Sequence, residues 1–239
     1  MMLSLEVTSN RFLTSDVVQM ELTSEQDLGR GSVGKFIHID VGRTLRRPIS
    51  ICEVDGHSLT IVYRIEGTGT AWLSERQSGE VLNALGPLGS GYPIMKSGKA
   101  LLVGGGIGIP PLLQTAKELA SNGVQVTTIL GFRSEPFLVE EFATYSDVHV
   151  VTEDGSHGTK GFVTDVMDAF TYDTFYSCGP RAMLQAVKQR ATSPGYLSLE
   201  ERMGCGVGAC LACVCDKADG TYAKVCTDGP VFESEEVVL

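Results

Sequence analysis

The stretch Glu200-Glu201-Arg202-Met203-Gly204-Cys205-Gly206-Val207-Gly208-Ala209-Cys210-Leu211-Ala212-Cys213-Val214-Cys215 organises this chain, and one more cysteine, Cys226, follows it. Reading from Cys205, the spacing is C-x4-C-x2-C with a further cysteine downstream. This spacing is typical of the thiolate ligands of a plant-type 2Fe-2S cluster. Because such a cluster carries one electron at a time, the pattern predicts a protein that transfers electrons.

Small residues surround these cysteines at positions 204, 206, 208, 209 and 212. A cluster accepts hydrogen bonds from backbone N–H groups, so the loop around it must wrap closely, and glycine permits the backbone angles that this needs. The alternative is a structural zinc site, which usually pairs its cysteines as C-x2-C. Only Cys210 and Cys213 form such a pair, which favours the cluster. Cys215 is expected to be a packed thiol.

Composition limits the classes of function. The chain has 239 residues and a net charge of −10, which predicts two domains with a small addition and disfavours a nucleic-acid partner. No stretch approaches the ~18 apolar residues of a membrane span, and the first residues do not resemble a secretory signal. We therefore expect a cytoplasmic protein with no membrane partner, whose clustered cysteines bind metal.

The first part of the chain predicts a small β-barrel. Short alternating or β-branched runs, separated by Gly, Asp and Asn, occupy Ser4–Thr8, Val17–Thr23, Phe36–Val41 and Ser58–Arg64. No helical period of useful length precedes Gly69.

Within this barrel, three short motifs predict a flavin dinucleotide site. Arg47-Pro48-Ile49-Ser50 combines a guanidinium, a rigid proline and a hydroxyl at the start of a strand. Tyr63-Arg64 follows, and Gly67-Thr68-Gly69-Thr70 opens a helix expected at Ala71–Gln77, whose N-terminus can face a pyrophosphate. Each motif alone also fits an ordinary turn or helix cap.

The middle of the chain predicts a nucleotide-binding α/β domain. A buried-type strand, Ala100–Val103, runs into Gly104-Gly105-Gly106-Ile107-Gly108, and a helix is expected over Leu112–Ser121. The turn departs from G-x-G-x-x-G, because Ile109 stands where the third glycine belongs. The alternation continues with strands at Val124–Leu130, Val148–Thr152 and Thr174–Ser177, and helices at Pro136–Tyr145, Val163–Phe170 and Arg181–Arg190.

Composition changes set the expected domain boundaries. We predict a flavin-binding barrel over residues 1–96, a nucleotide-binding domain over 97–194 and an iron-sulfur module over 195–239, because regular periodicity stops after Pro194-Gly195. Within the module, Asp219-Gly220 predicts a hairpin turn.

In this order the motifs resemble the ferredoxin-reductase superfamily, in which a Greek-key flavin barrel precedes a parallel-sheet pyridine-nucleotide domain. Arg47–Ser50 is similar to its flavin motif R-x-x-S, and Gly69-Thr70 to its pyrophosphate turn. Gly104–Gly108 resembles its nicotinamide-cofactor turn, and Cys178-Gly179-Pro180 its C-G-P motif beside the nicotinamide.

The segment from Leu199 to Cys213 resembles more narrowly the electron-transfer subunits of class 1B dihydroorotate dehydrogenase, and Gly86-Pro87-Leu88-Gly89 agrees. This resemblance spans essentially the whole chain. It implies FAD, a 2Fe-2S cluster and NAD, and a heterotetramer with a separate FMN-containing catalytic subunit, which serves pyrimidine biosynthesis. It also implies the cluster ligands, which are Cys205, Cys210, Cys213 and Cys226.

Cofactor chemistry explains why no catalytic side chain is expected, since the flavin and nicotinamide exchange hydride themselves. The four histidines are scattered along the chain. An added one-electron cluster makes sense mainly if electrons cross to another protein. Two alternatives stay open: a related FAD and 2Fe-2S reductase of NAD(P)H that serves a hydrogenase, an oxygenase or a ferredoxin, and a zinc-stabilised binding module without redox function. Arg133-Ser134 could accept the 2′-phosphate of NADP, although the resemblance favours NAD.

Overall fold

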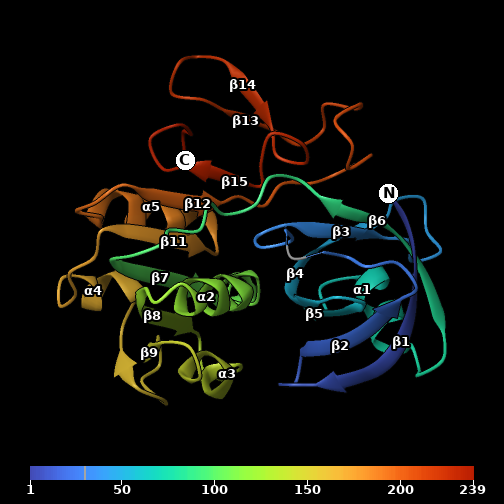
Figure 1. Cartoon of the computed structure of the whole chain (residues 1–239), viewed down its shortest axis with the longest axis horizontal. Helices are drawn as coiled ribbons and strands as arrows, with labels where there is room; N and C mark the ends of the chain where they lie inside the picture. Colours follow the sequence, from blue (N-terminus) through green and yellow to red (C-terminus); the bar gives the residue numbers. More distant parts are fainter. Residues whose placement is uncertain (30) are drawn as a thin grey trace.

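The computed structural model describes residues 1–29 and 31–239. Within these residues, six antiparallel strands close into a barrel in the order β1-β2-β5-β4-β3-β6, which is a Greek-key arrangement (Figure 1). The strands are β1 (Met2–Phe12), β2 (Val17–Ser24), β3 (Phe36–Ile39), β4 (Arg47–Asp55), β5 (Ser58–Arg64) and β6 (Val81–Leu88). Alternate side chains of β1, such as Leu3, Leu5 and Val7, are fully buried in the barrel core, as the period of two predicts.

One helix, α1 (Thr68–Ser74), connects β5 to β6. The sequence predicts this helix at Ala71–Gln77, so the predicted position is about one turn too late. The helix begins earlier because the Thr70 hydroxyl accepts hydrogen bonds from the backbone N–H groups of Glu66 (3.0 Å) and Gly67 (3.2 Å). Threonine therefore caps the turn that the glycines open.

The α/β domain is built on a sheet whose order, in the described part of the chain, is β10-β9-β8-β7-β11-β12-β15. Its strands are β7 (Lys99–Gly105), β8 (Gln125–Phe132), β9 (Asp147–Thr152), β10 (Thr159–Lys160), β11 (Thr174–Cys178), β12 (Gly195–Ser198) and β15 (Val231–Glu233). The helical elements are η1 (Gly106–Gly108), α2 (Pro111–Ser121), α3 (Val139–Ala143), α4 (Val163–Met167) and α5 (Arg181–Arg190). All pairs are parallel except β12 with β15. The predicted βαβ alternation is confirmed, and α3 and α4 are shorter than predicted.

The sheet continues past the point where sequence periodicity stops. Residues 195–198 form β12, which pairs with β11, and β15 then pairs with β12 from the far end of the chain. Strand β12 has only four residues, too few to show a clear period in the sequence, although its Leu197 is fully buried. The cysteine segment is therefore anchored to the sheet on both sides.

Between β12 and β15 the chain forms the cysteine loop and a hairpin of β13 (Val214–Asp216) and β14 (Tyr222–Lys224), whose turn contains Asp219-Gly220 as predicted. In Figure 1 this module, drawn in red, lies across the top of both the barrel and the α/β domain. It can therefore contact both.

Helix α2 packs the α/β domain against strand β4 of the barrel. The backbone N–H of Val54 donates to Oε1 of Gln114 (3.2 Å), and Lys117 pairs with Glu53 (3.5 Å). A single apolar cluster includes Val62 of the barrel and Leu112 of α2. No helix in residues 1–29 and 31–239 is both long and apolar enough to cross a membrane.

Candidate functional site

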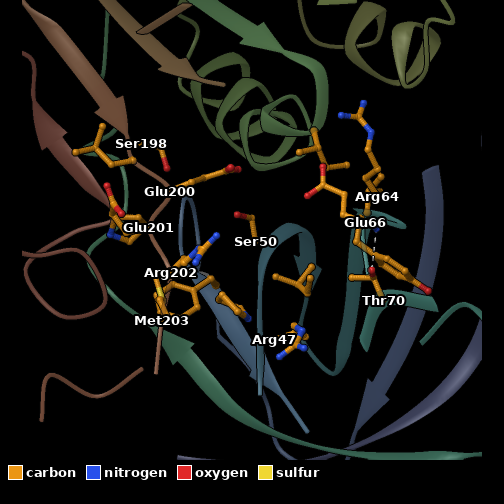
Figure 2. A pocket seen from close by; sticks show the side chains of 18 of the residues that line it. Arg47, Ser50, Arg64, Glu66, Thr70, Ser198, Glu200, Glu201, Arg202 and Met203 are labelled. Atoms are coloured by element: carbon orange, nitrogen blue, oxygen red, sulfur yellow. Dashed lines mark hydrogen bonds between the residues drawn. The ribbon is translucent and has the colours of Figure 1, made fainter. Parts of the chain in front are cut away.

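A cavity of ≈ 600 Å³ opens where the three parts of the chain meet. The barrel contributes the strands that carry the first two flavin motifs, the α/β domain contributes the turn after β7, and the segment after β12 closes the third side (Figure 2). The lining residues include Phe36, Arg47, Pro48, Ile49, Ser50, Val62, Tyr63, Arg64, Glu66, Gly67, Thr70, Ile107, Leu199, Glu200, Glu201, Arg202 and Met203. The predicted flavin motifs thus line one cavity.

Arg47 occupies a fixed position beside helix α1. Its Nη1 donates to the carbonyl oxygen of Leu45 (2.8 Å), and a Cβ atom at Gly69 would lie only 2.7 Å from its Nε. Glycine at position 69 therefore leaves the space that the guanidinium fills. A guanidinium held on its backbone side keeps its other N–H groups for an anion in the cavity.

The hydroxyl-bearing residues of the site have different environments. Ser50 lies on β4 and faces the cavity (Figure 2), whereas the hydroxyl of Thr70, in the first turn of α1, accepts hydrogen bonds from the turn before the helix. Tyr63 is buried, its hydroxyl donates to Oδ1 of Asn10 (3.4 Å), and burial raises the pKa of its phenol. The Tyr63 phenol is therefore a neutral part of the cavity wall, and Ser50 offers a hydroxyl group to a ligand.

Charged side chains stand at the junction between the barrel and the segment after β12. Arg64 pairs with Asp16 (Nε–Oδ2 3.2 Å), and Glu200 extends into the cavity opposite Arg64 and Glu66 (Figure 2). Part of the Glu200 side chain is exposed where the cavity opens, whereas its carboxyl group lies deeper, among protein atoms. This burial raises the pKa of Glu200, Glu66 raises it further, and Arg64 partly opposes both.

The glycine turn after β7 packs directly against the Cys178-Gly179-Pro180 loop. A Cβ atom at Gly108 would lie 2.5 Å from the carbonyl carbon of Cys178 and from the backbone nitrogen of Gly179. Gly104 pairs with Cys178 in the sheet, and a Cβ atom at Gly105 would lie 3.3 Å from Cδ of Pro180. Two motifs that lie far apart in the sequence thus form one surface at the carboxyl edge of the sheet, where α/β domains bind nucleotides.

The glycine turn also adjoins the cavity that the predicted flavin motifs line. Ile107, at the centre of the turn, lines the cavity, and Gly106 adopts φ +53° beside the guanidinium of Arg64. Cys178 is buried and its burial raises the pKa of the thiol, so the thiol is no part of the cavity wall. Glycine backbone, with Ile107 on the cavity side and Met183 packed over Gly105 and Gly179, therefore forms the nucleotide side of the candidate site.

In the cysteine loop, backbone N–H groups point at thiol sulfurs. Those of Val207 (3.4 Å) and Ala209 (3.2 Å) donate to Sγ of Cys205, and that of Gly208 donates to Sγ of Cys226 (3.2 Å). The N–H group of Val207, followed by hydrogen bonds with Cys210 and the N–H group of Ala209, lowers the pKa of Cys205 to about 6. The loop thus stabilises thiolate, which is the form that binds metal.

The four candidate ligands lie as two pairs. Cys205 and Cys210 interact with each other, and Cys213 and Cys226 with each other. Burial, followed by Cys213, raises the pKa of Cys226 to about 11, so metal binding there would release a proton. The second pair joins the cysteine loop to Cys226, which follows the β13–β14 hairpin. Among the described residues the thiols stand as these pairs and not as a group of three or more around one point, and four cysteines in two pairs are the donor set that a cluster of two irons needs.

Cys215 differs from these four cysteines. It lies on β13 opposite Ala223, and burial raises the pKa of its thiol. The charged groups that also shift this pKa are Glu201, Asp216 and Arg181, and no cysteine is among them. This environment supports the expectation that Cys215 is a packed thiol.

Sequence reasoning misses the third wall of the cavity. Residues 199–203 are predicted only as the approach to the cysteines, and their composition indicates no role of their own. Their position follows from β12, which places them beside the barrel. His38, fully buried on β3, also lacks any signal in the sequence beyond its apolar neighbours Ile37 and Ile39.

A flavin-type barrel, an adjoining parallel-sheet nucleotide domain and a cysteine loop that follows directly after the cavity-lining segment define a flavoprotein reductase of the ferredoxin-reductase type with its own iron-sulfur module. Residues 200–238 match the family model described as the iron-sulfur cluster binding domain of dihydroorotate dehydrogenase B. The chain belongs to the family of electron transfer subunits of dihydroorotate dehydrogenase B (NAD(+)), as the cysteine segment predicts. It is 47% identical to the subunit of that name from Bacillus caldolyticus over 249 residues, which cover 98% of this chain and 97% of the relative.

Other relatives and solved structures are similar to this chain in sequence or in fold. The corresponding subunit of Bacillus mycoides (strain KBAB4) is 47% identical over 251 residues, with 98% of this chain and 97% of the relative covered. A structure of the NADH-dependent reduced ferredoxin-NADP oxidoreductase superposes with a TM-score of 0.91 at 30% identity, covering 98% of this chain and 89% of that one. The ferredoxin reductase of carbazole 1,9a-dioxygenase (TM-score 0.69, 22% identity, covering 80% and 64%) shares the fold.

Proposed function

We propose that this chain carries electrons from a dihydroorotate-oxidising partner subunit, which contains FMN, to NAD⁺, in a heterotetramer of two subunits of each kind. FAD would lie in the cavity against Arg47–Ser50, Tyr63-Arg64 and Gly69-Thr70. NAD would lie at the joined loops Gly104–Gly108 and Cys178–Pro180. The 2Fe-2S cluster would be held by Cys205, Cys210, Cys213 and Cys226.

One observation carries this proposal: the segment that closes the flavin cavity is the segment that leads into the cysteine loop. Leu199 and Met203 both line the cavity, and Cys205 follows shortly after Met203 in the sequence. A one-electron carrier and a two-electron carrier would therefore be held by adjacent residues of one continuous segment. Such an arrangement is what conversion between single electrons and hydride requires.

The protein's own residues bind the cofactors and orient them. When bound, FAD exchanges single electrons with the cluster and hydride with the nicotinamide. Arg47 offers N–H groups to the pyrophosphate, Ser50 offers a hydroxyl to the flavin, and Tyr63 closes the wall as a neutral ring. The contact between Gly108 and the Cys178–Gly179 backbone fixes the nucleotide loop beside the cavity.

The exposed face of the cysteine module is the surface on which the partner subunit would dock. Cys210 is exposed, and apolar side chains around the loop and hairpin remain open: Leu211 is 63% exposed and Tyr222 72%. Val207 and Val214 are also exposed. Exposed large apolar side chains that gather around a cluster ligand are typical of an interface that brings a second redox centre close.

Reconstitution tests the proposal. The purified chain, loaded with flavin and iron, should show flavin and iron-sulfur absorbance. Combined with an FMN-containing dihydroorotate dehydrogenase subunit from the species of one of the relatives above, it should couple dihydroorotate oxidation to NAD⁺ reduction without oxygen. A chain that carries both cofactors but gives no NADH in the assembled complex would refute the assignment of substrate and partner.

A second candidate is a reductase of the same type that serves another electron carrier. It is favoured by the 30% identity and near-complete overlap with the ferredoxin-NADP oxidoreductase structure. The two candidates differ in the acceptor: reduction of ferredoxin by NAD(P)H without any partner subunit would support the second. NADH and NADPH should be compared in the same assay, because Arg133 is exposed directly after β8.

A further inference from the structure

His38 is a fully buried histidine of the barrel that the flavin and nucleotide sites do not use. It lies within β3 at 0% exposure, and neither ring nitrogen has a hydrogen-bond partner among the described residues. An unsatisfied buried donor is costly, so such a group usually has a specific reason to be retained. The neighbours of the ring indicate why His38 is retained.

The imidazole faces the cysteine loop. A Cβ atom at Gly206 would lie 2.4 Å from Nδ1 of His38, and Gly206 adopts φ +71°. Only glycine fits both the left-handed backbone and the close contact with the ring. Position 206 directly follows Cys205, so the ring packs against the turn that presents this cysteine.

Two carbonyl groups lie near the ring, although neither has hydrogen-bond geometry. Burial lowers the pKa of His38, while the main-chain carbonyls of Arg46 and Cys205 act in the opposite direction. In every protonation state the imidazole has at least one ring N–H to donate. One of these acceptors belongs to the start of the flavin strand and the other to the cysteine loop.

The backbone of His38 is held firmly. It pairs with Pro48 of β4, inside the flavin motif, and its carbonyl oxygen accepts a hydrogen bond from Nη1 of Arg46 (3.4 Å). The same Nη1 donates to the carbonyl oxygen of Asn83 on β6 (3.2 Å). His38 therefore presents its ring to the loop from the rigid part of the barrel that borders the flavin cavity.

We propose that His38 is a positioning residue for the iron-sulfur loop: its ring packs against Gly206, and a ring N–H donates to the carbonyl of Cys205 when the cluster is bound. In this way the barrel fixes the first cluster ligand relative to the flavin strand. This inference rests on the proposed function, because it requires Cys205 to be a ligand.

The test compares two substitutions in the cofactor-loaded complex with the catalytic partner. His38→Gln keeps an N–H donor, whereas His38→Leu fills similar space without one. We expect His38→Leu to lose iron to a chelator about fivefold faster, as the loss of one net hydrogen bond of about 1 kcal/mol implies, and to alter the electron paramagnetic resonance spectrum of the reduced cluster. His38→Gln should keep both properties near those of the unmodified chain. His57→Gln, at the exposed second histidine of the barrel, is the matched control and should change neither.

Leucine and glutamine variants that both match the unmodified chain, or that are equally impaired, would overturn the proposal. If His38→Leu does not retain FAD, a double-mutant cycle is used in its place. The cycle compares the rate of iron loss in His38→Ala, in Gly206→Ala and in the double variant. The backbone strain at position 206 is the same in both backgrounds. A smaller effect of Gly206→Ala in the His38→Ala background would therefore reveal the contact, and additive effects would refute it. An unmodified complex without any iron-sulfur signal would instead refute the proposed function.

Discussion

Gly69→Ala separates flavin binding from folding, because it should weaken FAD binding without lowering the stability of the flavin-free chain. Gly69 lies in the first turn of α1, is buried, and would place a Cβ atom 2.7 Å from Nε and 3.1 Å from Cζ of Arg47. The three nearest atoms, Nε, Cζ and Cγ, all belong to the Arg47 side chain, which is flexible. The substitution should therefore displace the guanidinium and leave the barrel intact.

The expected changes in stability and in FAD affinity follow from the helix position of Gly69 and from the charge of Arg47. Alanine is favoured over glycine in a helix by up to about 1 kcal/mol, so the flavin-free protein should be unchanged or slightly more stable. A displaced Arg47 loses a charge-assisted hydrogen bond to the pyrophosphate, worth about 1.5–3 kcal/mol. The dissociation constant of FAD should rise roughly 10- to 150-fold.

Flavin fluorescence titration of the flavin-free chain measures the affinity, and chemical denaturation of the same sample measures stability. Arg47→Gln is the matched variant: it should weaken FAD to a similar degree, and adding Gly69→Ala to it should cause little further loss. Unchanged affinity in Gly69→Ala, or equal further weakening in the Arg47→Gln background, would refute the role assigned to this pair.

Three further predictions concern the other parts of the site. Cys210→Ser should abolish iron-sulfur absorbance and transfer from the partner, while NADH oxidation by an artificial acceptor survives; loss of both activities with FAD still bound would contradict this. Gly108→Ala must shift the Cys178–Gly179 backbone, so we expect a loss of about 1–3 kcal/mol in the free energy of unfolding and a raised KM for NADH, whereas an unchanged KM would argue against this nucleotide surface. Glu200 has a raised pKa, so its protonated form contributes stability that is present below the ordinary glutamate pKa and is lost as pH rises through the raised value. Glu200→Gln should flatten this slope in pH-dependent denaturation of the flavin-free chain, and an unaltered slope would assign it to other groups.

The elements that the sequence predicts best are those with a strong period and clear ends. Strand β5 and helix α5 occupy the predicted residues, because alternation and a proline before the first helical turn mark them locally. The cluster spacing and the flavin motif are also predictable from sequence, since metal ligands and phosphate-binding turns impose residue types at fixed intervals.

What the sequence cannot reveal depends on contacts between distant segments. Strand β6 contains Gly86 and Pro87, which weaken its strand signal, yet it closes the barrel by pairing with β1 and β3. Likewise, β12 is recognisable only from its partner strands β11 and β15. Because residues 199–203 follow β12, the third wall of the cavity is hidden for the same reason.

The way in which the cysteine module is attached bears on how the subunit works. Its two ends are fixed to the sheet by β12 and β15, and the backbone N–H of Ser90, in the connection between the two larger domains, donates to the carbonyl oxygen of Gly229 (2.6 Å). The module is thus tied to the sheet and to the interdomain connection at once. Since electron transfer weakens steeply with distance, a module that moved independently would make the transfer rate vary with its position. Anchoring the loop on both sides, with the His38 ring against Gly206, holds its inner face beside the cavity, and its exposed apolar face is the surface proposed above for the partner.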